Sequence, residues 1–185
     1  MTRAKGYGQI GRYNAPLGTD TFVFEDDGLI PNSRLPLIVR RGAVSPAADD
    51  PASAFEKVFS QNGWTNGWRA DEIFDYHHYH STAHEVLGIA AGSANVRFGG
   101  EGGEAVGLTA GDVVVIPAGV GHALIKEAGD LVVVGAYADG RDWDIVRADQ
   151  GQMDSGARGR VGQVPLPDAD PVDGATGPLT KLWGG

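Results

Sequence analysis

The amino-acid sequence contains a series of short apolar or alternating runs, separated by glycines and turn residues, from residue 67 to residue 137. Seven of these runs have the length and apolar content of β-strands, at residues 68–80, 85–91, 94–98, 104–108, 112–116, 122–125 and 131–137. No helical pattern lies between them, so the helical crossovers that parallel strands need are missing. We therefore predict an all-β fold, an antiparallel β-barrel or sandwich.

The segments before and after this region predict smaller elements. Residues 1–20 are typical of an irregular arm, and the runs 21–24 and 35–40 of short strands. One short helix is predicted from Pro51, with Asp50 as its N-cap, because apolar residues recur on one face until Gly63. The tail is rich in glycine and proline and has no sustained period, which predicts coil. Apolar residues near its end would dock the tail on the barrel, namely Leu179, Leu182 and Trp183.

The length of 185 residues favours one domain, since barrels commonly reach about 200 residues. We expect this single domain over 1–185 to consist of N-terminal strands and a helix (1–64), a barrel core (65–140) and a C-terminal coil tail (141–185).

Charge and cysteine content exclude several kinds of function. The chain has 15 Lys and Arg against 24 Asp and Glu, a net charge of −9, so it lacks the basic surface that nucleic-acid binding needs. There are no cysteines, which excludes disulfides, thiolate nucleophiles, iron–sulfur clusters and cysteine zinc sites. Any metal ion must therefore bind to nitrogen and oxygen ligands. No apolar run is long enough for a signal peptide or a membrane span, so we expect a cytoplasmic protein with no membrane partner.

The histidines are the chemical centre of the sequence. Four of the five lie within eight residues, at 77, 78, 80 and 84, and the fifth is His122. On a strand, side chains two residues apart share a face, so His78 and His80 point the same way. Glu85 opens the next strand beside them, and His122 follows a distant glycine-rich turn. Three imidazoles and one carboxylate suit manganese, iron, nickel, copper or zinc. A histidine cluster of this kind also occurs on a solvated edge strand or as hydrogen-bonded core imidazoles.

Two segments together resemble the two sequence motifs of the cupin superfamily. The first motif, His-x-His followed by Glu and Gly at fixed spacing, matches residues 78–92. The second motif, Gly, then Pro-x-Gly and His, matches residues 111–122. The resemblance covers about residues 67–137 and implies a cupin-like jelly roll in which His78, His80, Glu85 and His122 bind one divalent transition metal ion (Fe, Mn, Ni, Cu or Zn). The segments 31–36 and 76–88 also look like the YjlB-like group of single-domain bacterial cupins.

The sequence departs from the family pattern at two positions that are not ligands. Glu72 stands where the first motif has glycine, and Lys126 stands where the second motif has asparagine. By strand parity Lys126 shares a face with His122, so it either reaches the pocket as a cation for a carboxylate substrate or lies exposed beyond the strand end.

Three side chains near the predicted ion are candidates for acid–base catalysis: Tyr76, His84 and Lys126. Tyr76 shares parity with His78 and either lines the pocket or belongs to the barrel wall. His84 points outward by alternation, unless it replaces a ligand or supports one. The tryptophans at 64, 68 and 143 are expected to form core or dimer contacts rather than a stacking platform.

Three functions fit such a site. The first is an enzyme, a mononuclear metal-dependent dioxygenase or an isomerase that acts on a small polar metabolite. The second is a cupin that binds a small ligand, a sugar or a carboxylate, without turnover. The third is a structural protein in which the metal ion only stabilises the barrel. This function is less favoured, because a structural site would be expected to close its coordination shell. The resemblance also implies pairing of barrels by their sheets, so we expect a homodimer.

Overall fold

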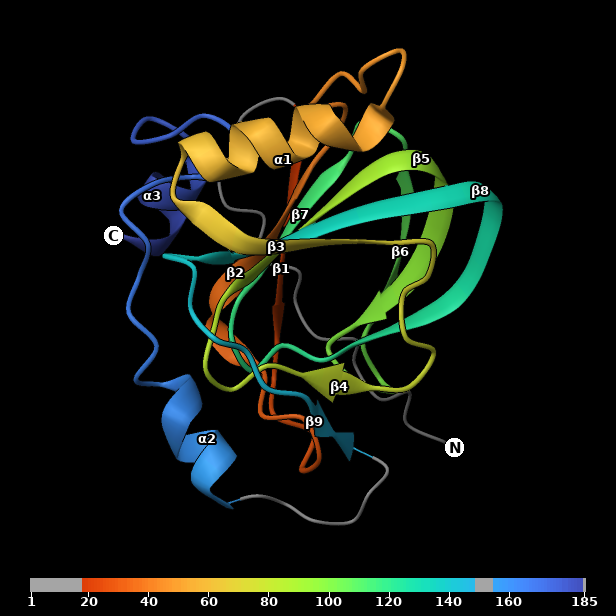
Figure 1. The fold of residues 1–185 in the computed structure, drawn as a ribbon. Helices are drawn as coiled ribbons and strands as arrows, with labels where there is room; N and C mark the ends of the chain where they lie inside the picture. Colours follow the sequence, from red (N-terminus) through yellow and green to blue (C-terminus); the bar gives the residue numbers. More distant parts are fainter. Residues whose placement is uncertain (1–17, 149–154, 185) are drawn as a thin grey trace.

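The computed structural model describes residues 18–148 and 155–184. Within this part of the chain, nine strands form one antiparallel sheet that curls into a barrel (Figure 1). The strands are β1 (Thr19–Phe24), β2 (Ser33–Arg40), β3 (Trp64–Ala70), β4 (His78–Tyr79), β5 (Glu85–Phe98), β6 (Glu104–Thr109), β7 (Val113–Ile116), β8 (His122–Ala138) and β9 (Val146–Arg147). The helices are α1 (Pro51–Gln61), α2 (Ser155–Val161) and α3 (Pro178–Trp183). The predicted all-β barrel with a short helix is therefore confirmed.

The hydrogen-bonded order of the main path is β1-β2-β7-β5-β8-β4-β9, with β3 paired to β8 and β6 paired to β5. This order places β4 beside β8, and the two strands pair at His78 and His122. Two of the predicted metal ligands, 44 positions apart in the sequence, are thus direct cross-strand neighbours.

The longest strands differ from the sequence prediction. The runs 85–91 and 94–98 form the single strand β5, and the runs 122–125 and 131–137 form the single strand β8. β5 and β8 pair along their lengths, with register shifts that accommodate the interrupting residues as bulges. Bulges bend a strand without ending it, so the glycines that predicted turns here mark the curvature of the barrel wall. The predicted strand 68–80, in contrast, is broken after Ala70 and resumes only at β4.

Both faces of the central strands are buried, which explains their continuous apolar runs. Alternate residues face the barrel interior, among them Leu37, Val39, Leu87, Val114 and Val133. Their neighbours face outward and pack under the helices, among them Ile38, Val86, Val113, Val115 and Val134.

Helix α1 covers the outer face of the barrel (Figure 1) and buries Phe55 and Phe59 against it. Asp50 occupies the N-cap position as predicted, but its side chain makes no capping hydrogen bond. The Asp50 carboxylate instead accepts two hydrogen bonds from the Arg69 guanidinium, each 2.9 Å long, and this bidentate ion pair replaces the cap.

The C-terminal segment is more ordered than the predicted coil, because it contains α2 and α3. Helix α3 begins at Pro178, where a missing backbone donor does no harm. Leu179 and Trp183 are buried, Leu182 is partly buried, and the Trp183 indole donates a hydrogen bond to the Pro36 carbonyl at 2.9 Å. The predicted docking of this end of the chain is confirmed. The predicted N-terminal arm lies almost entirely outside the described residues, and no described helix has the length and apolarity to cross a membrane.

Candidate metal site

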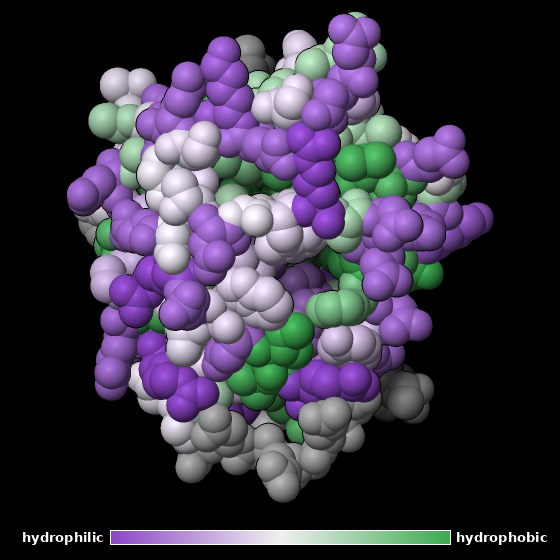
Figure 2. Space-filling model, in the orientation of Figure 1, coloured by the Kyte–Doolittle hydropathy of each residue, from purple (hydrophilic) through white to green (hydrophobic). Residues whose placement is uncertain are grey.

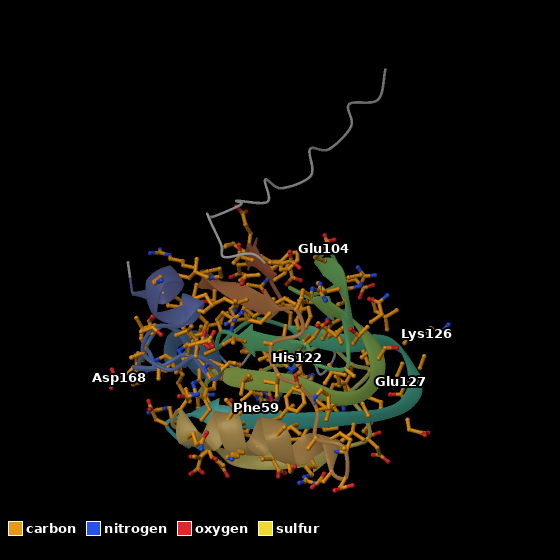
Figure 3. All side chains as sticks on the ribbon, turned by 90° about the horizontal axis from the view of Figure 1, so that it is seen from above. Phe59, Glu104, His122, Lys126, Glu127 and Asp168 are labelled. Atoms are coloured by element: carbon orange, nitrogen blue, oxygen red, sulfur yellow. The ribbon has the colours of Figure 1, made fainter. Side chains whose placement is uncertain are left out.

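The four predicted ligands lie together inside the barrel. His78 belongs to β4, His80 follows it directly, Glu85 begins β5 and His122 begins β8. All four side chains are buried, and ligand nitrogens of the three histidines lie within 4.8 Å of one another. Figure 3 shows His122 in the interior, between the strands of the barrel.

A tight turn brings His122 to this position. The turn before β8 contains Gly119, whose φ of +88° is in the left-handed region that favours glycine. A Cβ atom at this residue would lie 2.5 Å from the main-chain oxygen of Asn32, so the turn packs closely against a neighbouring segment. The amide of Gly119 also donates a hydrogen bond to the His80 carbonyl at 2.8 Å, which ties the two halves of the site together.

Main-chain carbonyls orient all three imidazoles. Nδ1 of His78 lies 3.0 Å from the Tyr76 oxygen, Nδ1 of His122 lies 3.4 Å from the Val120 oxygen, and Nδ1 of His80 contacts the Asp144 oxygen. A carbonyl oxygen only accepts hydrogen bonds, so each Nδ1 carries the proton. The unprotonated Nε2 atoms are therefore available to an ion, as they are in known histidine metal sites.

Glu85 completes the donor set. Its Oε1 accepts a hydrogen bond from the Tyr137 hydroxyl at 3.0 Å, and that hydroxyl accepts one from the Trp68 indole at 3.0 Å. Its Oε2 lies 3.2 Å from Nε2 of His80 and 3.4 Å from Nε2 of His122, yet it is buried without a hydrogen-bond partner. If neither Nε2 carries a proton, lone pairs face one another at these distances and repel, and a cation between them relieves this repulsion, so the residues fit a bound cation.

The pKa values of the site have the same physical origin. Burial, together with the nearby His122 and His80, lowers the pKa of His78 to about 3. Burial opposes the charge on His80, but the Glu85 carboxylate outweighs it and raises the pKa of His80 above its usual value. Burial would likewise raise the pKa of Glu85, but His80 and His122 hold it well below its usual range. Glu85 is thus ionised and is neutralised either by a proton on His80 or by a metal ion.

A cavity of about 230 Å³ opens beside the four ligands. Its wall is largely apolar, with the aromatic side chains Trp68, Phe74, Tyr137 and Trp143 and the aliphatic side chains Ala70, Ile73, Leu87 and Ile145. Glu72 also lines it. Phe74, Trp143 and Ile145 are each about two-fifths exposed. Figure 2 shows hydrophobic side chains gathered on this face of the molecule, close to β4 and β9. The cavity is open, and Phe74 and Leu87 lie in its wall.

The loop between β8 and β9 connects the cavity wall to the ligands. The Asp144 carboxylate accepts hydrogen bonds from the Ser81 amide at 2.6 Å and the Ser81 hydroxyl at 2.5 Å. The same residue offers its main-chain oxygen to His80, and its neighbours Trp143 and Ile145 line the cavity. Asp144 was not predicted from the sequence, where its only signal is its position in a short polar loop beside a tryptophan.

The structure places the three predicted acid–base residues outside the cavity lining. Tyr76 packs its ring on Phe74 at 5.0 Å and carries the Arg147 guanidinium at 3.7 Å on its ring. Its contribution to the site is its carbonyl, which orients His78.

Lys126 lies exposed on β8, and Figure 3 shows it at the outer edge of the molecule, away from His122. Strand alternation does not place Lys126 on the face of His122, because β8 has a bulge between Leu124 and Lys126. These two residues are two positions apart in β8 but pair with adjacent residues of β5, Val96 and Asn95. A pocket-facing Lys126 was therefore the wrong alternative.

His84 points away from the ligands, as alternation predicts, but it is buried and not solvated. Its ring lies 4.8 Å from the Trp183 ring, and its Nδ1 accepts a hydrogen bond from the Ala118 amide at 2.9 Å. His84 thus packs between the barrel and α3 and does not contact the cavity.

The tryptophans divide between two roles. Trp64 is a core residue, as expected, and its indole donates a hydrogen bond to the Ala169 carbonyl. Trp68 and Trp143 line the cavity, contrary to the sequence interpretation. Trp68 lies flat against β8 at Gly135, where a Cβ atom would lie 2.2 Å from the indole ring.

Comparison with known proteins agrees with this geometry. The fold and the site define the class of protein: a cupin barrel with a buried cluster of three histidines. Residues 76–142 match the cupin family model. The chain is 39% identical over 166 residues to the uncharacterized protein YjlB of Bacillus subtilis, covering 89% of this chain and 96% of YjlB. The chain therefore belongs to the cupin family and, within it, is related to YjlB along most of its length.

Solved structures are more distant. Oxalate decarboxylase of Bacillus subtilis, in a study of its Mn(II) centres, is 17% identical with a TM-score of 0.38 and covers 64% of this chain. The TDP-quinovose 3,4-ketoisomerase of Campylobacter jejuni is 15% identical with a TM-score of 0.36 and covers 42% of this chain. The chain spans 29% of the decarboxylase and 65% of the ketoisomerase.

Proposed function

We propose that this cupin is a mononuclear metal-dependent enzyme of the dioxygenase type, which oxidises a small organic molecule with dioxygen. One observation carries the proposal: four buried ligand side chains form one wall of an open cavity. A structural metal site closes its coordination shell with protein ligands, whereas a catalytic site leaves positions for water or substrate.

His78, His80, His122 and Glu85 would hold the ion. A redox-active ion such as iron, manganese, nickel or copper would supply electron transfer between the organic substrate and dioxygen. In a dioxygenase reaction both oxygen atoms enter the organic product and the substrate supplies the electrons, so no separate reductant is needed. The chain's own residues bind the substrate, and the apolar wall excludes water from it.

An isomerase is less well supported because it needs a residue that takes up a proton and returns it. Among the described residues that line the cavity, the titratable groups besides the metal ligands are Glu72 and Tyr137. Burial and the neighbouring Glu85 raise the pKa of Tyr137 above its usual value, and its proton is directed to Glu85. Glu72 is exposed. The same shortage of acid–base groups favours the second candidate, a cupin that binds a small ligand without turnover.

The test is oxygen uptake by protein loaded separately with Fe²⁺, Mn²⁺, Ni²⁺, Cu²⁺ or Zn²⁺, with phenols, β-diketones and thiols as substrates. The proposal predicts that one redox-active ion supports consumption of one dioxygen per substrate, with no release of hydrogen peroxide. The zinc form and the His122→Ala variant should be inactive. If the protein binds only zinc, or if no loaded form consumes dioxygen with any substrate, ligand binding without turnover replaces the proposal.

A further inference from the structure

Two aromatic rings of the cavity wall lie against the predicted ligand imidazoles. The Phe74 ring lies 5.4 Å from the His78 ring, and the Trp143 ring lies 5.7 Å from the His80 ring, both edge-on. Phe74 is 40% exposed and Trp143 is 42% exposed. Large apolar side chains that stay exposed beside a cavity with a few convergent polar groups are typical of a ligand-binding site.

These rings are held in place before any ligand binds. Trp143 stacks on Tyr137 with ring centres 5.6 Å apart and planes 19° apart, and the next residue, Asp144, is anchored to Ser81. Phe74 stacks on Tyr76 with planes 15° apart, and its carbonyl accepts a hydrogen bond from the Leu124 amide at 2.8 Å. A wall that is already ordered loses little freedom when a flat ligand packs on it.

The charges of the site limit the ligand further. A divalent ion held by three neutral imidazoles and the Glu85 carboxylate has a net charge of 2 − 1 = +1, which one negative charge neutralises. No Lys or Arg is among the described residues that line the cavity, and the one further charged side chain there is the carboxylate of Glu72. A dicarboxylate would therefore place its second charge against an apolar wall without a cation, which is costly.

We infer that the cavity selects a flat aromatic ligand that carries a single negative charge at the ion, such as a phenolate or an aromatic enolate, and that Phe74 and Trp143 are the residues that select it. This inference rests on the proposed metal site and replaces the expected small polar metabolite. Under this inference, ligand specificity depends on Phe74 and Trp143 in the loops, and metal binding depends on residues in and next to the barrel strands.

Three chelators of Co²⁺ test the inference on cobalt-loaded protein: tropolone, acetylacetone and oxalate. Tropolone is a flat aromatic monoanion, acetylacetone binds through two oxygens with the same charge but no aromatic ring, and oxalate is a dianion. Isothermal titration calorimetry and the visible spectrum of Co²⁺ report binding, and each affinity is divided by that of the chelator for free Co²⁺. Tropolone should then bind at least tenfold better than oxalate, with acetylacetone between them.

Variants separate the two aromatic residues from the metal. Phe74→Leu and Trp143→Leu should each weaken tropolone binding about tenfold and change acetylacetone binding less than twofold. Phe74→Lys should weaken tropolone and strengthen oxalate, because it adds the missing cation. Ile125→Ala, a substitution of an exposed residue of β8, is the matched control and should change nothing. Cobalt affinity without a chelator should be the same as wild type in the two Leu variants and in Ile125→Ala.

Two outcomes overturn the inference on its own: oxalate binds as well as tropolone after correction, or the Leu variants weaken all three chelators equally while cobalt affinity is retained. If the wild-type protein takes up no cobalt at the histidine cluster, the proposed function fails first and the inference falls with it.

Discussion

The main-chain oxygen of Asp144 accepts a hydrogen bond from Nδ1 of His80, so a residue in the loop beside the cavity also orients a predicted metal ligand. The Asp144 carboxylate holds this arrangement, because both its oxygens accept hydrogen bonds from Ser81, the residue directly after His80. Arg160, near the end of α2, lies 3.4 Å from the same carboxylate and donates a hydrogen bond to the Ser81 hydroxyl at 2.9 Å. The predicted metal ligand His80, the cavity wall and helix α2 thus meet at the Asp144 side chain.

Replacement of Asp144 should weaken metal binding although the residue is not a ligand. In Asp144→Ala the carbonyl remains but the contacts with Ser81 are lost, so we expect the affinity for Co²⁺ to fall about tenfold, the lower end of the effect of outer-shell partners. Competition with a chromophoric chelator measures the affinity. Asp142→Asn, in the same loop and exposed, is the control. Equal affinities of wild type and Asp144→Ala would show that the loop does not position His80.

Gly119→Ala should reduce the free energy of unfolding by about 1–3 kcal/mol. The residue has a φ of +88°, and a Cβ atom would lie 2.5 Å from the Asn32 carbonyl oxygen, so the turn before His122 must shift. Urea unfolding measures the change. Gly102→Ala serves as the matched control, since no heavy atom lies within 4 Å of its added Cβ and its φ is not positive. A loss no greater than that of the control would contradict the role of the turn.

His84 should make stability depend on pH. Burial lowers the pKa of His84 to about 4 from an ordinary 6.5, so the unfolded chain binds the proton first as the pH falls. The folded protein therefore keeps this contribution above about pH 6.5 and loses it between about pH 6.5 and 4, with a total of about 3 kcal/mol.

The difference between wild type and His84→Gln, measured by urea unfolding of the metal-free protein from pH 4 to 8, isolates this contribution. His77→Gln, at a partly exposed histidine, is the control. Parallel pH profiles for wild type and His84→Gln would contradict the assignment.

Sequence spacing was sufficient to predict that His78, His80, Glu85 and His122 lie together, because His-x-His on one strand and a histidine after a glycine turn are local patterns that the barrel only needs to bring together. The cavity wall was not predictable in the same way. Phe74 and Trp143 lie in irregular segments, whose positions depend on tertiary contacts such as Asp144 with Ser81 and Tyr137 with Trp143. No periodicity in these segments indicates which way a side chain points.

Strand parity worked where strands are regular and failed where they bulge. It placed His84 on the opposite face from Glu85, but it could not show that Trp183, from the far end of the chain, covers that face. The bulge after Leu124 moved Lys126 away from the cavity, and nothing in the sequence of β8 marks that bulge.

The most direct test of the metal site is anomalous X-ray diffraction from crystals grown with Co²⁺. The account predicts one strong anomalous peak, about 2.0–2.2 Å from Nε2 of His78, His80 and His122 and from a carboxylate oxygen of Glu85. Lys126→Ala crystals should show the same peak, and Glu85→Gln crystals a weaker one. Crystals in which these four side chains have no peak between them, or in which the cobalt binds to other residues, would contradict the account.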